Sequence, residues 1–158
     1  MVNSAQQARD AVAAMGFPPL GNRSTGSSAR ATVYGSDYQE TANDEILCVV
    51  QIENAVAVRD IDDIVAVPGV DACFIGPVDL GSSMGLKPGQ QAQHPEFEAA
   101  IQCVLAAARH AGKPAGIHVQ TSEDANKRLK EGFQFIALAT DKALLTNEAK
   151  RQLAAVAQ

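Results

Sequence analysis

The sequence predicts an α/β fold in which crossover helices join the strands of a parallel sheet, and three observations lead to this prediction. From residue 46 onward, a stretch of strand length is followed by a helical pattern four times. The stretches ILCVV (46–50) and FIALA (135–139) are almost continuously apolar, as strands buried on both faces are. The 158 residues are enough for one domain with its own core.

The first element is a predicted helix over 4–15, because Ser4 can cap it and Gly16, with Pro18 and Pro19 behind it, would end it. Residues 16–44 are rich in Gly, Ser, Asn and Asp, and we expect a loop there. A loop of this length is typical of a lid, an interface arm or a disordered segment, and composition leaves these three options open.

Four strand–helix pairs are expected next, at 46–53 with 55–65, 71–76 with 95–111, 114–119 with 122–131, and 133–139 with 142–156. Gly112 and Gly132 follow the second and third helices, and Thr121 and Thr140, with the residues after them, can cap the last two. We therefore expect one domain over 1–158, made of a helix (1–15), a loop or arm (16–44) and four βα units (45–158).

Composition and charge exclude several classes of protein. Hydrophobic residues make up 46% and charged residues 20%, as in ordinary globular proteins. The net charge of −5, with scattered Lys and Arg, gives no basic patch for nucleic acid or an anionic membrane. No signal peptide or membrane-spanning run is recognisable, so we expect a cytoplasmic protein. Cys48, Cys73 and Cys103 lie in apolar runs and are predicted to be reduced thiols in the core.

Two acidic residues follow the carboxyl ends of the first two predicted strands, where parallel α/β folds bind ligands. Glu53 closes the first strand and Asp79 comes just past the second. Neighbouring strands lie about 5 Å apart, so both carboxylates can reach one cation, which would also relieve their repulsion. With no His or Cys nearby in sequence, the ligands would be oxygens, which suits magnesium or manganese rather than zinc.

Residues around the two acids predict an anion site beside this cation. Gln51 lies two residues before Glu53 and points to the same side of its strand, where its amide can hold a ligand oxygen. The turn at Gly76 and Pro77 can present the backbone amides of Val78 and Asp79 to an anion.

Each of these residues also has a structural alternative. Asp79 could equally be the N-cap of a following helix, and Gln51 could be a hydrogen-bonded amide of the core. For Glu53 the functional interpretation is favoured, because Asn54 can cap the next helix in its place.

Other polar residues are weaker candidates. His118 on the third strand could face the site, although a single strand histidine is more typical of a structural role. His94 and His110 are expected to be exposed at helix ends, Asp141 to cap the last helix, and Arg23 to bind an anion or to be solvated. There is no P-loop, no dinucleotide fingerprint and no GxSxG motif.

The run VVQIENAVAVRDIDDIVAVPGVDACFIGPVDLGSSMG (49–85), with FPPLGNRS (17–24) and HPEFEAAI (94–101), closely resembles the HpcH/HpaI aldolases. These are metal-dependent class II pyruvate aldolases of the phosphoenolpyruvate/pyruvate superfamily. The resemblance covers the chain from about Val2 to its end, and the paired motifs QIE and GPVDL are specific. It implies that the fold is the C-terminal half of a TIM (β/α)8 barrel, with four parallel strands and crossover helices.

The resemblance also implies roles for particular residues. Glu53 and Asp79 fall on the family's ligands for a divalent metal (magnesium, manganese or cobalt). Gln51 falls on a substrate-contacting glutamine. The segment of Gly76, Pro77, Val78 and Asp79 falls on the one whose amides bind the carboxylate of pyruvate or another 2-keto acid. The implied function is a carbon–carbon lyase that acts on 4-hydroxy-2-keto acids through a pyruvate enolate, with an aldehyde as the second small molecule. A homo-oligomer is implied too, because the family's C-terminal helix packs on a neighbouring subunit.

The family's proton-transferring histidine and substrate-binding arginine, which lie in the preceding half of the barrel, have no counterpart here. We therefore predict no catalytic residue in this chain. We expect residues 1–3 to match the end of a fourth family strand in a truncated gene product, whose activity is impaired when the chain is alone. A half-barrel that assembles with a second copy or a partner, and a flattened doubly wound sheet, are the open alternatives. The alternative functions are a non-catalytic metal- or pyruvate-binding subunit and an unrelated domain in which Glu53 and Asp79 are separate caps.

Overall fold

A computed structural model describes residues 1–26, 33–87 and 89–156 of the chain. Its centre is a four-stranded sheet of β1 (Val49–Ile52), β2 (Ala72–Ile75), β3 (Ala115–Val119) and β4 (Phe135–Leu138). The strands lie in the order β1-β2-β3-β4, and all neighbouring pairs are parallel. The predicted α/β fold with a parallel sheet is therefore confirmed.

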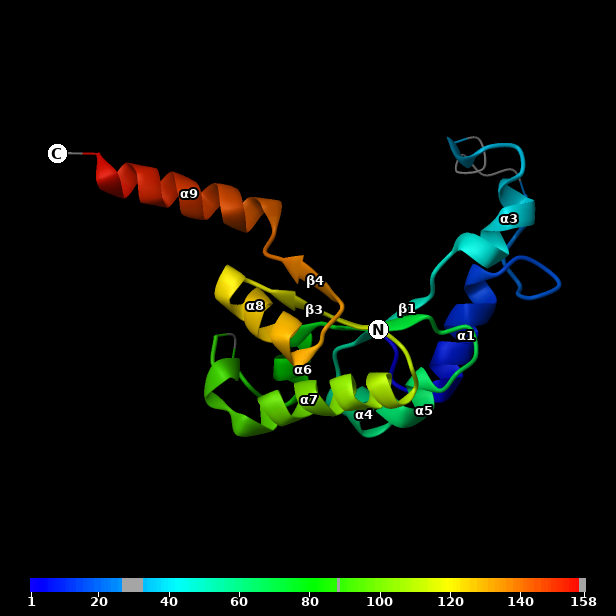
Figure 1. The fold of residues 1–158 in the computed structure, drawn as a ribbon, viewed down its shortest axis with the longest axis horizontal. Coiled ribbons are helices and arrows are strands. Elements are labelled where there is room, and N and C mark those ends of the chain that lie inside the picture. Colours follow the sequence, from blue (N-terminus) through cyan, green and yellow to red (C-terminus); the bar gives the residue numbers. More distant parts are fainter. Residues whose placement is uncertain (27–32, 88, 157–158) are drawn as a thin grey trace.

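The helices that connect and flank the strands are α1 (Ala5–Met15), α3 (Tyr38–Glu45), α4 (Ala55–Arg59), α5 (Ile61–Val65), α6 (Pro77–Ser83), the 3-10 turn η1 (Gln91–Gln93), α7 (Pro95–His110), α8 (Ser122–Glu131) and α9 (Asp141–Ala155). Figure 1 shows α4, α5 and α7 on one side of the sheet. In the same view α9 extends away from the sheet beyond β4, and none of its residues is buried.

The core lies between one face of the sheet and the helices that cover it. Alternate strand residues, among them Ile52, Ile75 and Ile117, are almost completely buried there. They belong to one apolar cluster with residues of the covering helices, such as Ile64 of α5 and Val104 of α7. The opposite face of the sheet, called the open face below, carries partly exposed side chains instead.

The predicted caps explain where most helices begin and end. Ser4, Asn54, Thr121 and Thr140 each accept a backbone N–H of the first turn of their helix. Gly132 ends α8 with φ +100, a left-handed conformation that glycine adopts without steric cost. Asp141, expected as a cap of α9, is instead the first residue of that helix, because Thr140 makes the capping bond.

The structure differs from the predicted elements at three places. The helix predicted over 55–65 is two short helices, α4 and α5, with Asp60 between them. The loop predicted over 16–44 contains most of α3, which tertiary contacts stabilise: the Asn43 side chain bonds the N–H and C=O of Phe17 at 2.7 and 3.1 Å. Residues 27–32 of that segment lie outside the described part. The third difference, α6, was not predicted and has fully buried Leu80 as its core anchor.

The prediction of three core thiols is correct for two of them. Cys48 and Cys73 are buried, but Cys103 is exposed. Residues 101, 104, 105 and 108 of α7 form its buried face, and Cys103 falls on the opposite side of the helix. Within the described residues, no helix is long and apolar enough to cross a membrane.

Candidate functional site

Glu53 places a buried carboxylate at the carboxyl end of β1. Its residue is only 8% exposed, and its Oε2 accepts a 2.6 Å hydrogen bond from the side-chain amide of Gln51. The two side chains meet because residues two apart in a strand point to the same face. Asn54, rather than Glu53, caps α4 by accepting the Val56 N–H at 2.8 Å. A capping role therefore does not account for Glu53.

Gly76 lies directly beside Glu53 on the neighbouring strand. Its N–H donates to the Ile52 carbonyl at 3.1 Å, which continues the β1–β2 ladder by one residue. A Cβ at position 76 would come 2.5 Å from Oε2 of Glu53 and 3.0 Å from Nε2 of Gln51. The absence of a side chain at Gly76 is therefore what leaves room for these two polar groups.

Asp79 follows in the first turn of α6. The N-cap of this helix is Gly76, Pro77 is its first residue, and the helix has no side-chain cap. The interpretation of Asp79 as an N-cap is therefore wrong. The first intrahelical hydrogen bond of α6 is donated by the Leu80 N–H to the Gly76 carbonyl at 3.0 Å. The backbone amides of Val78 and Asp79 come before it and have no acceptor within the helix. Both residues are exposed.

Strand register places further residues level with Glu53. Ile52, Ile75 and Ile117 pair across the first three strands, and His118 pairs with Ala137 of β4. The next position along β1, β2, β3 and β4 thus forms one row across the open face, here called the carboxyl-end row: Glu53, Gly76, His118 and Ala137.

Asn3 extends this row on the other side of Glu53. The Val2 N–H donates to the Gln51 carbonyl at 3.1 Å, so residues 2 and 3 run beside the end of β1. The Asn3 side-chain oxygen is buried and has no hydrogen-bond partner among the described residues. The sequence interpretation expected residues 1–3 to match the end of a preceding strand, which agrees with this pairing, but it did not single out the Asn3 side chain, because a polar residue before a helix cap gives no signal of a ligand role.

Two stacked aromatic rings form an apolar floor one layer below the carboxyl-end row. Phe74 pairs with Gly116 in the β2–β3 register, and Gly116 pairs with Phe135. The rings of Phe74 and Phe135 stack at 5.3 Å between centroids. They meet across Gly116, where any side chain would collide with the Phe135 ring.

A cavity of about 300 Å³ lies at the same end of the sheet and is lined by Pro77, Val78 and His118, among other residues. A second cavity, of about 380 Å³, is lined by Cys48, Gly69 and other residues that precede β1 and β2. It therefore lies at the amino ends of the strands, away from the two candidate ligands. The first cavity shares Pro77 and Val78 with the turn of the candidate site. Its apolar lining residues Phe97, Ile101 and Ile117 place it mainly on the helix-covered side of the sheet.

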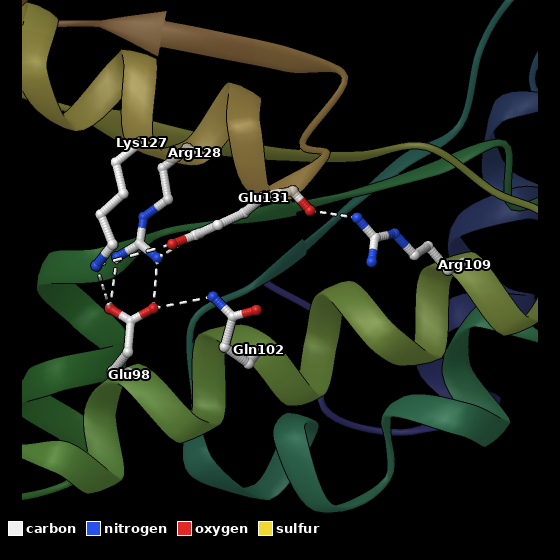
Figure 2. Close-up of polar contacts among 6 residues, drawn as sticks. All are labelled: Glu98, Gln102, Arg109, Lys127, Arg128 and Glu131. Carbon is white, nitrogen blue, oxygen red and sulfur yellow. Dashed lines mark hydrogen bonds and ion pairs between the residues drawn. The ribbon is translucent and has the colours of Figure 1, made fainter.

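A polar network fixes one wall of this cavity by joining α7 to α8, as Figure 2 shows. Arg128 donates to both carboxylate oxygens of Glu98, at 2.6 and 2.8 Å, and to Glu131 at 2.8 Å. Lys127 and Gln102 also donate to Glu98. The Arg128 guanidinium is the main reason why the pKa of Glu98 falls to about 2. Sequence reasoning did not find this network, because its members come from two helices.

The remaining polar candidates lie elsewhere. Arg23 sits over the rings of Phe17 and Tyr38, at 4.5 and 5.5 Å from their centroids, so its guanidinium has aromatic partners rather than only solvent. His94 precedes the first residue of α7 and His110 is its last, at the helix ends where they were expected.

The chemistry of the site suits a hard divalent cation. No group of three or more His, Cys, Asp or Glu side chains that could hold a metal occurs within residues 1–26, 33–87 and 89–156, so a zinc-type cage is not present there. Magnesium-like ions need only one or two protein carboxylates and keep several waters. The buried Glu53 carboxylate, bonded to a neutral amide, and the unpartnered Asn3 oxygen fit such an ion.

The chain is similar to known aldolases over nearly all of its length. A model of the HpcH/HpaI aldolase/citrate lyase family matches residues 1–148. A 2-dehydro-3,6-dideoxy-6-sulfogluconate aldolase of Pseudomonas putida is 40% identical over 98% of this chain and 61% of that protein. A 4-hydroxy-2-oxo-heptane-1,7-dioate aldolase of Shigella sonnei is also 40% identical, over 95% of this chain and 58% of that protein.

Solved structures show the same relationship. An HpcH/HpaI aldolase/citrate lyase family protein from Burkholderia cenocepacia superimposes with a TM-score of 0.89 at 33% identity, over 97% of this chain and 61% of that one. An HpcH/HpaI aldolase from Desulfitobacterium hafniense gives 0.84 at 30% identity, over 96% and 60%. The chain thus spans about three fifths of the length of its relatives, and its four βα units correspond to part of their barrel. The chain belongs to the HpcH/HpaI aldolase/citrate lyase family.

Proposed function

We propose that this chain carries the enolate-forming part of a metal-dependent aldolase that cleaves 4-hydroxy-2-keto acids into pyruvate and an aldehyde. The observation that carries the proposal is the buried Glu53 carboxylate, which is hydrogen-bonded to Gln51 and lies beside Gly76. Gly76 is the N-cap of α6, and Asp79 follows in the first turn of that helix. The relatives' names support the substrate class, since each describes an aldolase of a keto acid or a dehydro-sugar acid.

In this proposal, Glu53 and Asp79 are the protein ligands of magnesium, manganese or cobalt. Lewis-acid stabilisation of the enolate oxygen is the chemistry that such an ion would supply. Gln51 orients the Glu53 carboxylate and has a second amide hydrogen for a substrate oxygen. The free amides of Val78 and Asp79, placed by the turn at Gly76 and Pro77, bind the substrate carboxylate.

The floor and the glycine have supporting roles. The stacked rings of Phe74 and Phe135 give an apolar surface below the reacting atoms, with Phe135 itself 39% exposed. Gly76 keeps the space in front of Glu53 open to a ligand.

We also propose that the chain acts as a homo-oligomer. On α9, Leu144, Leu145 and Leu153 are 59, 75 and 73% exposed, which is unfavourable unless another subunit covers them. Sedimentation equilibrium should then give a mass that is a multiple of 16.5 kDa. A monomer at micromolar concentration would contradict this part of the proposal.

The proposed activity is tested by exchange of the pyruvate methyl protons with D2O, followed by proton NMR. We expect slow exchange with magnesium, manganese or cobalt, because solvent has to take the proton in place of the family's histidine. We expect none with EDTA and none in Glu53→Gln. Glu45→Gln, a matched change of an exposed carboxylate, should exchange like the wild type. Metal binding without exchange would support the alternative, a non-catalytic metal- or pyruvate-binding subunit. Exchange that is the same with EDTA would contradict both.

A further inference from the structure

We propose that His118 accepts a hydrogen bond from the C4 hydroxyl of the 4-hydroxy-2-keto acid and takes its proton as the carbon–carbon bond breaks. This inference rests on the proposed function, and it assigns to this chain a proton-accepting group at the site.

The position of His118 follows from strand register. It lies in the carboxyl-end row with Glu53, and Gly76 is the residue between them. Because Gly76 has no side chain, nothing from β2 fills the space between the carboxylate and the imidazole. Two strand spacings separate the two backbones by about 10 Å. A keto acid held by its first two carbons near Glu53 would therefore extend its C4 oxygen toward His118.

The hydrogen bond that His118 makes determines which ring nitrogen is free. Its Nε2 lies 3.3 Å from the carbonyl oxygen of Ala139. Since a carbonyl oxygen only accepts, Nε2 must carry the proton in this contact, and Nδ1 of the neutral ring is left with a lone pair. His118 is thus held in the tautomer that accepts a hydrogen bond through Nδ1.

The backbone that supplies this carbonyl is itself unusual. Ala139 has φ +54, a left-handed conformation that a non-glycine residue rarely adopts. Its N–H donates to the Val119 carbonyl at 2.7 Å, so both polar groups of this residue are tied to β3. Strain of this kind persists where surrounding contacts impose it, often at functional sites. Here it aims the Ala139 carbonyl at Nε2.

The other ring nitrogen remains available to a ligand. Nδ1 and Nε2 are separated by a carbon in the imidazole ring, so the contact of Nε2 with Ala139 does not occupy Nδ1. In the part of the chain that the structure describes, Nδ1 has no hydrogen-bond partner. His118 is half-buried, and its register position puts it on the open face with Glu53.

The proposed step balances in atoms and charge. The C4 hydroxyl proton moves to Nδ1 of His118, the oxygen electrons form the C4 carbonyl of the aldehyde, and the C3–C4 bond pair becomes the pyruvate enolate. The enolate carbon then takes a proton from solvent, and Nδ1 returns its proton to solvent. Exchange of pyruvate methyl protons, which involves no C4 hydroxyl, does not require His118.

The test is side-chain 15N NMR of the full chain with magnesium, using pyruvate, 2-oxopentanoate and 4-hydroxy-2-oxopentanoate as ligands. The last two differ only in the C4 hydroxyl. We expect the Nδ1 signal of His118 to shift with the hydroxy acid and to stay unchanged with the other two. His110→Gln, a matched change at an exposed helix end, should leave this response intact.

His118→Gln provides a second measurement. Loss of one such hydrogen bond should weaken binding of the hydroxy acid about tenfold and leave pyruvate affinity and methyl exchange within twofold. Binding of pyruvate without any Nδ1 response to the hydroxy acid would overturn the inference alone. If none of the three ligands binds, the proposed function fails and this inference fails with it.

Discussion

Gly76 lies so close to Glu53 that a Cβ on residue 76 would come 2.5 Å from the Glu53 carboxylate oxygen and 3.0 Å from its Cβ. The contact joins the last residue before α6 to the end of β1, two points that are 23 positions apart in the sequence. Gly76 has an ordinary negative φ of −97°, so its backbone conformation does not require glycine. The glycine of the GPVDL motif is explained instead by the space that its missing side chain leaves for Glu53.

Gly76→Ala should therefore damage the site more than the fold. The added methyl group has to displace the Glu53 side chain, and we expect divalent-cation affinity to fall at least tenfold with a stability loss of about 1 kcal/mol. Calorimetric titration with manganese and urea unfolding measure the two effects. Gly26→Ala is the control and should change neither, because a Cβ there would make only an ordinary 3.5 Å contact with the Ser24 hydroxyl. Unchanged manganese affinity in Gly76→Ala would show that this space is not a ligand site.

Arg128→Met should destabilise the contact between α7 and α8. The Arg128 side chain is 11% exposed, and its guanidinium donates to Glu98 and Glu131, so its removal leaves both carboxylates without their main partner. We expect the free energy of unfolding in urea to fall by about 1–3 kcal/mol. Arg151→Met is the matched control, because its pair with Glu148 on α9 is exposed, and it should have no measurable effect. Equal effects of the two substitutions would contradict a structural role for this network.

The low pKa of Glu98 predicts a pH dependence of stability. The Arg128 guanidinium lowers this pKa from 4.5 to about 2 in the folded state. Because the unfolded state then binds the proton more readily, the stabilisation is complete above about pH 4.5 and is lost as the pH falls toward 2. The stability difference between wild type and Glu98→Gln should thus shrink over this range in urea titrations. A difference that stays constant from pH 6 to pH 3 would rule out this linkage.

The thiols should differ in reactivity. Burial raises the pKa of Cys73 to about 11, and burial followed by the Asp71 charge raises the pKa of Cys48. Cys103 is exposed. We expect a thiolate-selective reagent to label Cys103 rapidly in the folded protein at pH 8 and to label the other two only after unfolding. Mass spectrometry of the digested protein identifies the labelled positions, and rapid labelling of Cys73 would contradict the packing of β2.

Local sequence signals predict much of this fold. The apolar runs identified all four strands, and polar caps such as Thr121 and Thr140 identified the starts of the last two helices, because caps and burial act over a few residues. Helix α3 was missed because the helix is polar and depends on the contact of Asn43 with Phe17, 26 residues away. Helix α6 was missed because Gly81 and two serines resemble a loop, although Pro77 at its first position was a usable signal.

The sequence predicted the part of the candidate site that lies within one strand, but not the part that depends on strand pairing. The two-residue spacing of Gln51 and Glu53 predicted that both point to the same side of β1, and in the structure the two side chains are hydrogen-bonded to each other. The row that joins His118 to Glu53 depends on the register of three strands, and no local pattern encodes this register. The orphaned oxygen of Asn3 likewise follows from the pairing of Val2 with β1. The contacts of the site that were not predicted are therefore those that depend on long-range strand pairing.

The central claim is that Glu53 and Asp79 together hold one divalent cation, and manganese binding followed by electron paramagnetic resonance tests it most directly. We expect one site per chain in the wild type and at least a tenfold loss of affinity in both Glu53→Gln and Asp79→Asn, since each removes a charged ligand. Glu45→Gln and Asp62→Asn, which change exposed carboxylates, should bind like the wild type. Wild-type affinity in either Glu53→Gln or Asp79→Asn would contradict the account.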